Sequence, residues 1–327
     1  MLRILWLLLS SFISISAGHA IATTPVETNW PTKPIKLVVP GGAGGVPDIR
    51  ARWLAERISP LLGQTVWIEN KPGAGGNIAM ESVARSVPDG YSLVVMHLGV
   101  MAFNPFMYDR LGYDPIKDFI PITRLGVGPL LLVANTKVPA NTVQELVQLA
   151  KSKPGQLSYG TPGIGTPPHM ALELFKRTAK IDVVGVPYQS GAQSMIDLIG
   201  GQTAFTMDGM QLSMPNAKAG RVRPLAVTGR SRLTSLPDVP TLMESGYPEY
   251  EFYAWTGVAA PAGTPKAIID RLYAAMSKVL RSDEAKRWFG SVENEPGGET
   301  PEATAAIVRA EYARWGKLIK EAGIKAE

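Results

Sequence analysis

The 327-residue sequence contains no cysteine at all. Disulfide frameworks, thiolate metal sites and cysteine nucleophiles are therefore excluded. A chain of this length without disulfides must rely on a large hydrophobic core, and an apolar content of 45% allows one. By length, we expect one or two domains of ordinary size.

Long hydrophobic runs are also missing, because no stretch is apolar over the roughly 20 residues that a membrane-spanning helix needs. Residues 4–15, which are apolar apart from three serines, follow Arg3 and precede the small-x-small sequence Ala20-Ile21-Ala22. This order is typical of a secretory signal peptide. We predict a signal peptide over residues 1–22, cleaved near Ala22, and a soluble mature chain that works outside the cytoplasm.

The net charge is small, because 33 Lys and Arg stand against 28 Asp and Glu. Removing residues 1–22 takes away one base, Arg3, and no acid, so 33 − 1 = 32 bases remain and the mature chain carries +4. Basic residues are scattered and form no run with interleaved aromatic side chains, so we expect no nucleic-acid partner. The weak positive bias suits anionic ligands only in a general way.

Nucleotide-binding fingerprints are absent as well. The sequence has no G-x-x-x-x-G-K-[ST] motif, and both Gly-Ala-Gly-Gly loops fail as G-x-G-x-x-G. The third glycine of that pattern is replaced by Pro47 in the first loop and by Ile78 in the second. A dinucleotide site is therefore disfavoured.

Catalytic groups are few. His19 leaves with the predicted signal peptide, so His97 and His169 remain, and neither belongs to an H-E-x-x-H pair. No Gly-x-Ser-x-Gly elbow is present. We expect no cofactor, no metal site and no catalytic residue, and hence not an enzyme. An exported hydrolase that uses His97 or His169 as a base stays open as the alternative.

What the sequence does contain is a regular alternation of strand-like and helix-like segments. Residues 35–39, 66–70 and 91–96 are short apolar runs typical of strands, and residues 49–62 and 78–86 follow a helical period. This alternation predicts a parallel, doubly wound sheet. A second series of the same kind follows, with predicted strands at residues 130–134, 157–160, 183–186, 203–207 and 225–228.

The C-terminal segment is helical from Lys266 and ends in an amphipathic helix over residues 301–322. It has no glycine-rich site of its own and most simply packs back on the first series. We therefore predict two α/β lobes with a cleft between them, the second inserted in the first. Lobe 1 comprises residues 23–125 and 249–327, and lobe 2 comprises residues 126–248. Ligands in such sheets bind outside the carboxyl ends of the strands.

The first candidate site is the glycine loop Gly42-Ala43-Gly44-Gly45, which follows a predicted strand and precedes a predicted helix. Such a loop can present backbone N–H groups to an anion, and the helix N-terminus adds partial positive charge. Asp48 then lies in the first helical turn. A tight turn that binds nothing is the equally weighted alternative from this stretch alone.

A second loop, rich in glycine and proline, runs from Thr161 through Gly163, Gly165 and Thr166 to His169. His169 could donate to an anion or could hold only its own loop. Two further polar residues, His97 and Asp208, stand at the carboxyl ends of predicted strands. Asp208 would repel an anion directly, so we expect it to orient a loop or to accept from a ligand hydroxyl or amine.

With these residues assembled, the chain closely resembles the exported solute receptors of tripartite tricarboxylate transporters, the Bug receptors. The matching pieces run in order through nearly the whole mature chain. They are WPTKPI at residues 30–35, VVPGGAGGVPD at 38–48, ENKPGAGGN at 69–77, PDGY at 88–91, NP at 104–105, GIGTPPH at 163–169, VPY at 186–188, LPDVPT at 236–241 and PAGTP at 261–265.

The resemblance implies a type II-like, two-lobed periplasmic binding protein, each lobe a mostly parallel sheet flanked by helices. Such a receptor closes on a small mono-, di- or tricarboxylate or aromatic acid and delivers it to membrane permease subunits; we expect a monomer. A receptor that reports to a sensor kinase in a two-component system is left open. The implied ligand-binding residues are Gly42, Ala43, Gly44, Gly45, Asp48, Thr161, Gly163, Gly165, Thr166 and His169, with Asp208 nearby. His97 is a candidate for the cleft only because it ends a predicted strand, and plain packing is the alternative for it.

Two positions depart from the family pattern. Members of the family often carry Phe where this chain has Gly41, so the pocket could be wider here. They also often carry Ser or Thr before the aspartate, where this chain has Val46-Pro47. One or two hydroxyl donors are therefore missing, and ligand identity does not transfer from better-known members.

Overall fold

The structure, a computed structural model, describes residues 29–326. The predicted signal peptide at residues 1–22 lies outside the described residues. From Pro31 onward the chain forms one compact unit. Among residues 29–326, no helix combines the length and the apolar character needed to cross a membrane.

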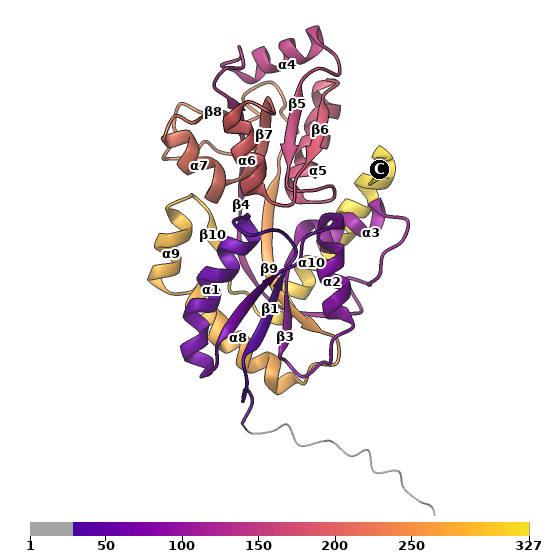
Figure 1. Cartoon of the computed structure of the whole chain (residues 1–327), viewed down its shortest axis with the longest axis vertical. Helices are drawn as coiled ribbons and strands as arrows, with labels where there is room; N and C mark the ends of the chain where they lie inside the picture. Colours follow the sequence, from indigo (N-terminus) through magenta and orange to yellow (C-terminus); the bar gives the residue numbers. More distant parts are fainter. Residues whose placement is uncertain (1–28, 327) are drawn as a thin grey trace, which may run out of the picture. The chain divides into compact units, whose positions relative to one another are not determined.

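A ten-stranded sheet organises the described residues, with the strand order β2-β1-β3-β9-β4-β7-β5-β6 and with β8 and β10 also paired to β4 (Figure 1). The strands are β1 (Ile35–Val39), β2 (Val66–Asn70), β3 (Ser92–His97), β4 (Phe119–Asn135), β5 (Ser158–Thr161), β6 (Val184–Pro187), β7 (Phe205–Gly209), β8 (Val222–Val227), β9 (Tyr253–Pro261) and β10 (Glu295–Pro296).

The sheet has two halves joined by β4. The first half contains β2, β1, β3, β9 and residues 119–129 of β4; the second contains residues 130–135 of β4 with β7, β8, β5 and β6. β1 pairs in parallel with β2 and β3, and β5 pairs in parallel with β6 and β7, as predicted. β4 runs antiparallel to β7, β8, β9 and β10, and β9 runs antiparallel to β3. The strands at residues 130–134 and 225–228, predicted to belong to the second parallel series, are therefore paired antiparallel, because β4 runs opposite to its neighbours. The α/β prediction is confirmed.

A second detail of the sequence prediction is wrong. Residues 130–134 are predicted to form a strand of their own, but they are the last part of β4, which is continuous over 17 residues. Its register against β9 shifts between Pro121 and Thr123 and again between Arg124 and Gly126. These irregularities let one strand bend from the first half of the sheet into the second. The glycines in the middle of β4 therefore lie within a continuous strand and do not end it.

Helices cover the sheet on both sides (Figure 1). Side-chain caps begin several of them: Thr142 accepts from the N–H of Glu145 at 3.1 Å, as its position before a helical pattern predicts. The helices are α1 (Val46–Leu62), α2 (Asn77–Ala84), α3 (Asn104–Met107), α4 (Val143–Ser152), α5 (Pro167–Ala179), α6 (Gly191–Gly200), α7 (Met210–Lys218), α8 (Lys266–Leu280), α9 (Asp283–Gly290) and α10 (Pro301–Ala322).

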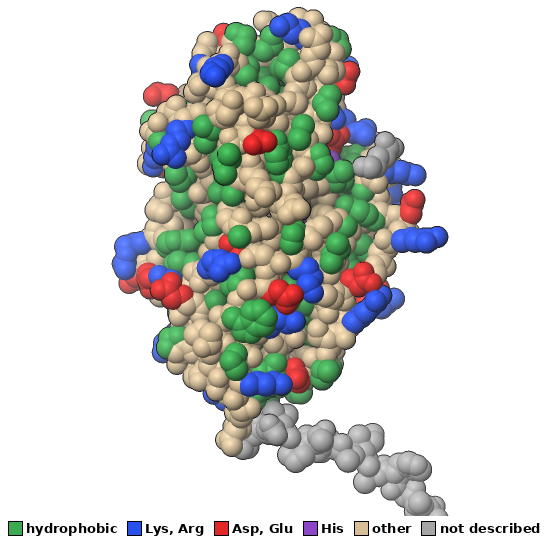
Figure 2. Space-filling view, viewed as in Figure 1, with side chains coloured by type: hydrophobic (Ala, Val, Ile, Leu, Met, Phe, Trp, Pro, Cys, Tyr) green, Lys and Arg blue, Asp and Glu red, His purple; other side chains and the backbone are tan. Residues whose placement is uncertain are grey.

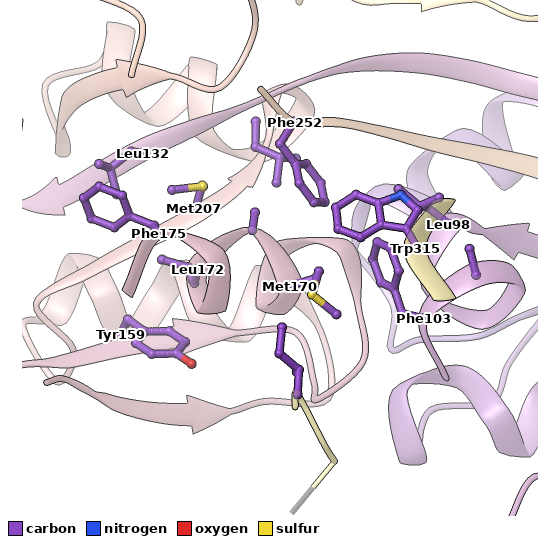
Figure 3. Close-up of a cluster of buried hydrophobic side chains, with 14 of the residues drawn as sticks. Leu98, Phe103, Leu132, Tyr159, Met170, Leu172, Phe175, Met207, Phe252 and Trp315 are labelled. Carbon is purple, nitrogen blue, oxygen red and sulfur yellow. The ribbon is translucent and has the colours of Figure 1, made fainter. Parts of the chain in front are cut away.

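The main core continues from the first half into the second. Trp315 of α10 packs edge to face on Phe103, with ring centroids 4.7 Å apart, and lies beside Phe252 (Figure 3). Further along the same core, Phe175 and Met207 belong to the second half. The C-terminal helix thus lies against the first half, where its amphipathic pattern places it. On the surface, acidic and basic side chains are interspersed over the face shown in Figure 2.

Candidate functional site

A cavity lies where the two halves of the sheet meet, at the carboxyl ends of β1, β3 and β7; we call it the central cavity. This is the position at which an α/β sheet is expected to bind a ligand. The cavity is lined by residues 39–42, 45–47, 50, 97, 128–130, 162, 166–168, 189–191, 208–209, 254–256 and 294.

The N-termini of α1, α5, α6 and α7 all meet at the central cavity. Pro47 and Pro167, each at the start of its helix, line the cavity, as do Gly191 of α6 and Gly209, the residue before α7. A helix N-terminus carries a partial positive charge and, where its first residues are not proline, unpaired N–H groups. Pro47 and Pro167 have no N–H, so at these positions α1 and α5 contribute the positive end of the helix and not a donor. Because these ends converge, the electrostatic potential in the cavity favours an anion.

The glycine loop approaches the second half of the sheet directly. The N–H of Gly42 donates to the backbone oxygen of Gln189 at 2.9 Å, and a Cβ at Gly42 would lie only 3.0 Å from that oxygen. The N–H of Gly44 donates to a carboxylate oxygen of Asp48 at 2.9 Å. Glycine at position 42 therefore permits contact between the halves, and these N–H groups already have partners within the protein.

Asp48 is buried and organises the glycine loop. Besides the N–H of Gly44, its carboxylate accepts from Arg52 at 3.0 Å and from Asn70 at 2.9 Å. Burial alone would raise the pKa of Asp48, but the bonds from Arg52, Gly44 and Asn70 outweigh burial and lower it. The carboxylate is thus ionised and fully engaged, and it holds the loop in shape.

Arg50 lies one turn into α1 and brings a guanidinium to the central cavity. Its Nη1 donates to the oxygen of Gly126 at 2.9 Å and to the hydroxyl of Thr256 at 3.0 Å. Among the described residues, no carboxylate lies within ion-pair distance, and burial lowers the pKa of Arg50 to about 9. The guanidinium stays charged at neutral pH without a counter-ion.

Asp208 ends β7 and faces the same cavity, with 3% of its surface exposed. Its Oδ1 accepts from the N–H of Gly209 at 2.6 Å, whereas Oδ2 has no hydrogen-bond partner among the described residues. Burial raises the pKa of Asp208 to about 7. At neutral pH this carboxyl group can therefore either donate or accept a hydrogen bond.

His97 ends β3 and is also buried at the cavity wall. Its Nδ1 accepts from the N–H groups of Gly99 at 3.1 Å and Val100 at 3.3 Å. Burial lowers the pKa of His97 to about 4, so the ring is neutral and carries its proton on Nε2. Across the sheet, His97 pairs with Thr256, the residue that receives a hydrogen bond from Arg50.

His169 and Thr161 line a different pocket, behind α5. The Nδ1 of His169 accepts from the N–H of Gly165 at 3.4 Å. In the same pocket, Glu173 accepts from the Tyr159 hydroxyl at 2.6 Å and from the Lys176 ammonium at 2.8 Å. We call Tyr159, Glu173 and Lys176 the Glu173 cluster.

The structure therefore brings together only part of the residues that the sequence pointed to. Those that line the central cavity are Gly42, Gly45, His97, Thr166 and Asp208; those that do not are Ala43, Gly44, Asp48, Thr161, Gly163, Gly165 and His169. The ligand-binding roles of all of them stay predictions.

Sequence reasoning missed Arg50, the α6 N-terminus at Ser190 and Gly191, and Asn294. One signal was available for Arg50: it stands three and four residues before Trp53 and Leu54, on the apolar face of the predicted helix. An arginine on the apolar face of a helix is unusual and indicates a buried polar contact or a ligand. For Asn294, which follows α9, no local pattern points to the cavity.

Within residues 29–326, no group of three or more His, Asp or Glu side chains is arranged to hold a metal ion. The chemistry of the central cavity is that of binding: helix N-termini, a buried guanidinium, a carboxyl group near its pKa and a neutral imidazole surround one space.

Residues 50–324 match the family described as "Tripartite tricarboxylate transporter family receptor". Among solved structures, the chain is 38% identical to Rpa4515 of R. palustris with adipate, with a TM-score of 0.87 over 90% of this chain and 99% of that one. It is 35% identical to the periplasmic binding protein BugD, with a TM-score of 0.87 over 91% of this chain and 100% of that one. MatC from Rhodopseudomonas palustris with bound malate is 31% identical, with a TM-score of 0.85 over 89% of this chain and 100% of that one.

Proposed function

The chain belongs to the family of tripartite tricarboxylate transporter receptors, and we propose that it binds a small carboxylate in the central cavity and delivers it to a transporter of that type. The family consists of periplasmic solute receptors and not of enzymes, which removes the alternative of an exported hydrolase. Two relatives of known structure carry the dicarboxylates adipate and malate, respectively.

The observation that carries the proposal is the convergence of helix N-termini on a cavity that also holds a buried guanidinium. Both features stabilise negative charge, and both act more strongly where water is excluded. Carboxylate, phosphate and sulfate all bind at helix N-termini, and the relatives with bound adipate and malate favour a carboxylate.

The energy required is modest. Each hydrogen bond to a charged group contributes roughly 1.5–3 kcal/mol. A micromolar receptor needs about 8 kcal/mol net, after the cost of ordering the ligand and the protein. A few bonds from helix N-termini together with the field of Arg50 are sufficient for that affinity.

Delivery requires the receptor to open and close, and we propose that it does so between lobes bounded as the sequence predicts: residues 23–125 and 249–327 against residues 126–248. The bond from Gly42 to Gln189 joins these lobes and would break on opening. The transporter would then distinguish the liganded, closed form from the open one. We further propose cleavage near Ala22 and a monomeric mature protein.

Thermal-shift screening tests this proposal on mature protein unfolded and refolded to release bound ligand. We expect at least one mono-, di- or tricarboxylate or aromatic acid to raise the melting temperature by roughly 5–10 °C at about 1,000 times its Kd. The methyl esters of the same acids serve as matched controls and should give no shift. If no carboxylate in the panel raises the melting temperature, the proposed function is wrong.

A further inference from the structure

Arg50 is a charged side chain in the protein interior, where a charge without an opposite charge is rare. Only 4% of its surface is exposed, and no acidic side chain of the described residues lies within ion-pair distance. By contrast, Arg57 on the same helix lies outside the central cavity and pairs with Glu284 at 2.6 Å. Desolvating a charge is costly unless an opposite charge or a dense set of hydrogen bonds compensates.

Within residues 29–326, the partners of Arg50 are all uncharged, and they include the ring of Phe289, whose centroid lies 5.5 Å from Cζ. Nη1 reaches a backbone oxygen and a hydroxyl, those of Gly126 and Thr256. In the orientation that satisfies its neighbours, the amide oxygen of Gln211 accepts from Nε at 3.1 Å and from Nη2 at 3.2 Å. These contacts hold the guanidinium in one position but do not neutralise it.

The wall around Arg50 is polar and partly unsatisfied. Asn294 lines the central cavity beside it, and its Nδ2 donates to the same Gln211 oxygen at 3.0 Å. The Oδ1 of Asn294 is buried without a partner among the described residues. Gly128 of β4 leaves the space that Asn294 fills, because a Cβ there would overlap its amide. This part of the cavity lining therefore holds the Arg50 guanidinium in place and supplies no carboxylate to pair with it.

The acidic group of the cavity does not serve as that anion. Asp208 faces the same space, but it forms no ion pair with Arg50, and burial raises its pKa to about 7. Burial thus disfavours the ionised form of Asp208, and no carboxylate of residues 29–326 lies within ion-pair distance of Arg50. The glycine loop and the α6 N-terminus form a separate set of cavity residues that shares none of the contacts of Arg50.

We propose that Arg50 is the counter-charge for a second anionic group of the ligand, so that this receptor selects dicarboxylates over monocarboxylates of the same length. One carboxylate would lie at the helix N-termini, and the other would lie against the guanidinium beside Thr256 and Asn294. The proposal rests on the proposed function, because it assigns the ligand class of the same cavity.

A cycle of protein and ligand variants tests it by isothermal titration calorimetry. The probes are succinate, glutarate and adipate, together with the monoamide of whichever binds most tightly. The monoamide keeps the length and one charge and loses the other. We expect wild type to prefer the diacid about 100-fold, and Arg50→Gln to prefer it less than about 5-fold. The control Arg57→Gln should keep the wild-type preference.

A purely structural Arg50 gives a different result. In that case Arg50→Gln weakens diacid and monoamide by the same factor, and the preference survives; this outcome overturns the proposal. So does a wild type that binds both ligands equally. Arg50→Lys retains the charge and should keep a preference of at least about 10-fold, which tests the proposal even if Arg50→Gln does not fold. Failure of every carboxylate to bind wild type would instead reject the proposed function itself.

Discussion

Two polar regions of this molecule, the Glu173 cluster and the central cavity, differ in whether the protein supplies a partner for each charged group. In the Glu173 cluster, the carboxylate meets an ammonium at 2.8 Å and a hydroxyl at 2.6 Å. In the central cavity, Arg50 has no carboxylate, and the Oδ2 of Asp208 has no partner among the described residues. A buried charge that meets an opposite charge within the protein indicates a structural role, and a buried charge without one indicates a place for a ligand.

The same difference appears in the titration of the two carboxyl groups. Burial alone would raise the pKa of Glu173, but the bonds from Lys176 and Tyr159 outweigh burial and lower it. For Asp208, burial dominates and raises the pKa to about 7, because a single backbone N–H opposes it. Only the second group changes its charge near physiological pH.

The largest effect on stability should come from the Glu173 cluster. Glu173→Ala leaves the Lys176 ammonium and the Tyr159 hydroxyl without their acceptor in a partly buried pocket. We expect a loss of roughly 3 kcal/mol in the free energy of unfolding, measured by urea denaturation. Carboxylate affinity should change by less than about 3-fold. A variant of normal stability and impaired binding would reverse the roles of the two regions.

Asp208→Asn should change the pH dependence of stability. Because the folded-state pKa of Asp208 is about 7 and its ordinary value is 3.8, the native state binds more protons between these pH values. Its contribution to stability is therefore lost as pH rises from about 4 to 7. We expect the variant to gain roughly 2 kcal/mol over wild type at pH 8 and little at pH 5.

His97 titrates in the opposite sense, since its lowered pKa of about 4 costs stability as pH falls below its ordinary value of 6.5. That contribution is common to wild type and Asp208→Asn, so the difference between their unfolding free energies isolates Asp208. If the unfolding free energies of wild type and Asp208→Asn differed equally at pH 5 and pH 8, burial would not raise the pKa of Asp208.

The two histidines provide a smaller, paired test. His97→Ala removes the acceptor for the N–H groups of Gly99 and Val100 at the cavity wall. We expect about a 10-fold loss of carboxylate affinity by calorimetry. His169→Ala changes a different pocket and should alter affinity by less than about 2-fold. A larger effect of His169→Ala would place the ligand nearer to α5 than the cavity lining indicates.

The smallest effect should come from Arg52→Gln. Arg52 is half exposed, and exposed ion pairs contribute about 0–1 kcal/mol. Asp48 keeps its bonds from Gly44 and Asn70 in this variant, so the glycine loop should hold its shape. We expect less than about 1 kcal/mol of lost unfolding free energy by urea denaturation. A loss comparable to that of Glu173→Ala would mean that the Asp48 pair is as structural as the Glu173 cluster.

Local patterns were enough to predict the βα series, the glycine loop and the strand ends at His97 and Asp208. Each depends on neighbours in sequence, such as an apolar run followed by glycines. The continuity of β4 could not be predicted, because Gly126 and Gly128 look like a break. Their small size instead accommodates Phe289 and Asn294, which lie more than 150 positions away in the chain.

The wall around Arg50 escaped prediction for the same reason. It joins α1, β4, β9 and Asn294, and its partners Gly126 and Thr256 are 76 and 206 positions from Arg50. The unpaired state of a charge is a property of the whole fold, because it depends on every acidic group that could have approached and did not. Sequence shows that Arg50 lies on an apolar face, and only the structure shows what surrounds it.

The most direct test of this account is a crystal structure of the protein with the dicarboxylate that binds most tightly in the titration series. We predict one ligand carboxylate at the N-termini of α1 and α6, and the other within about 3 Å of the Arg50 guanidinium. A ligand that leaves Arg50 with only its contacts to Gly126, Thr256 and Gln211, and places both carboxylates elsewhere, would contradict the account.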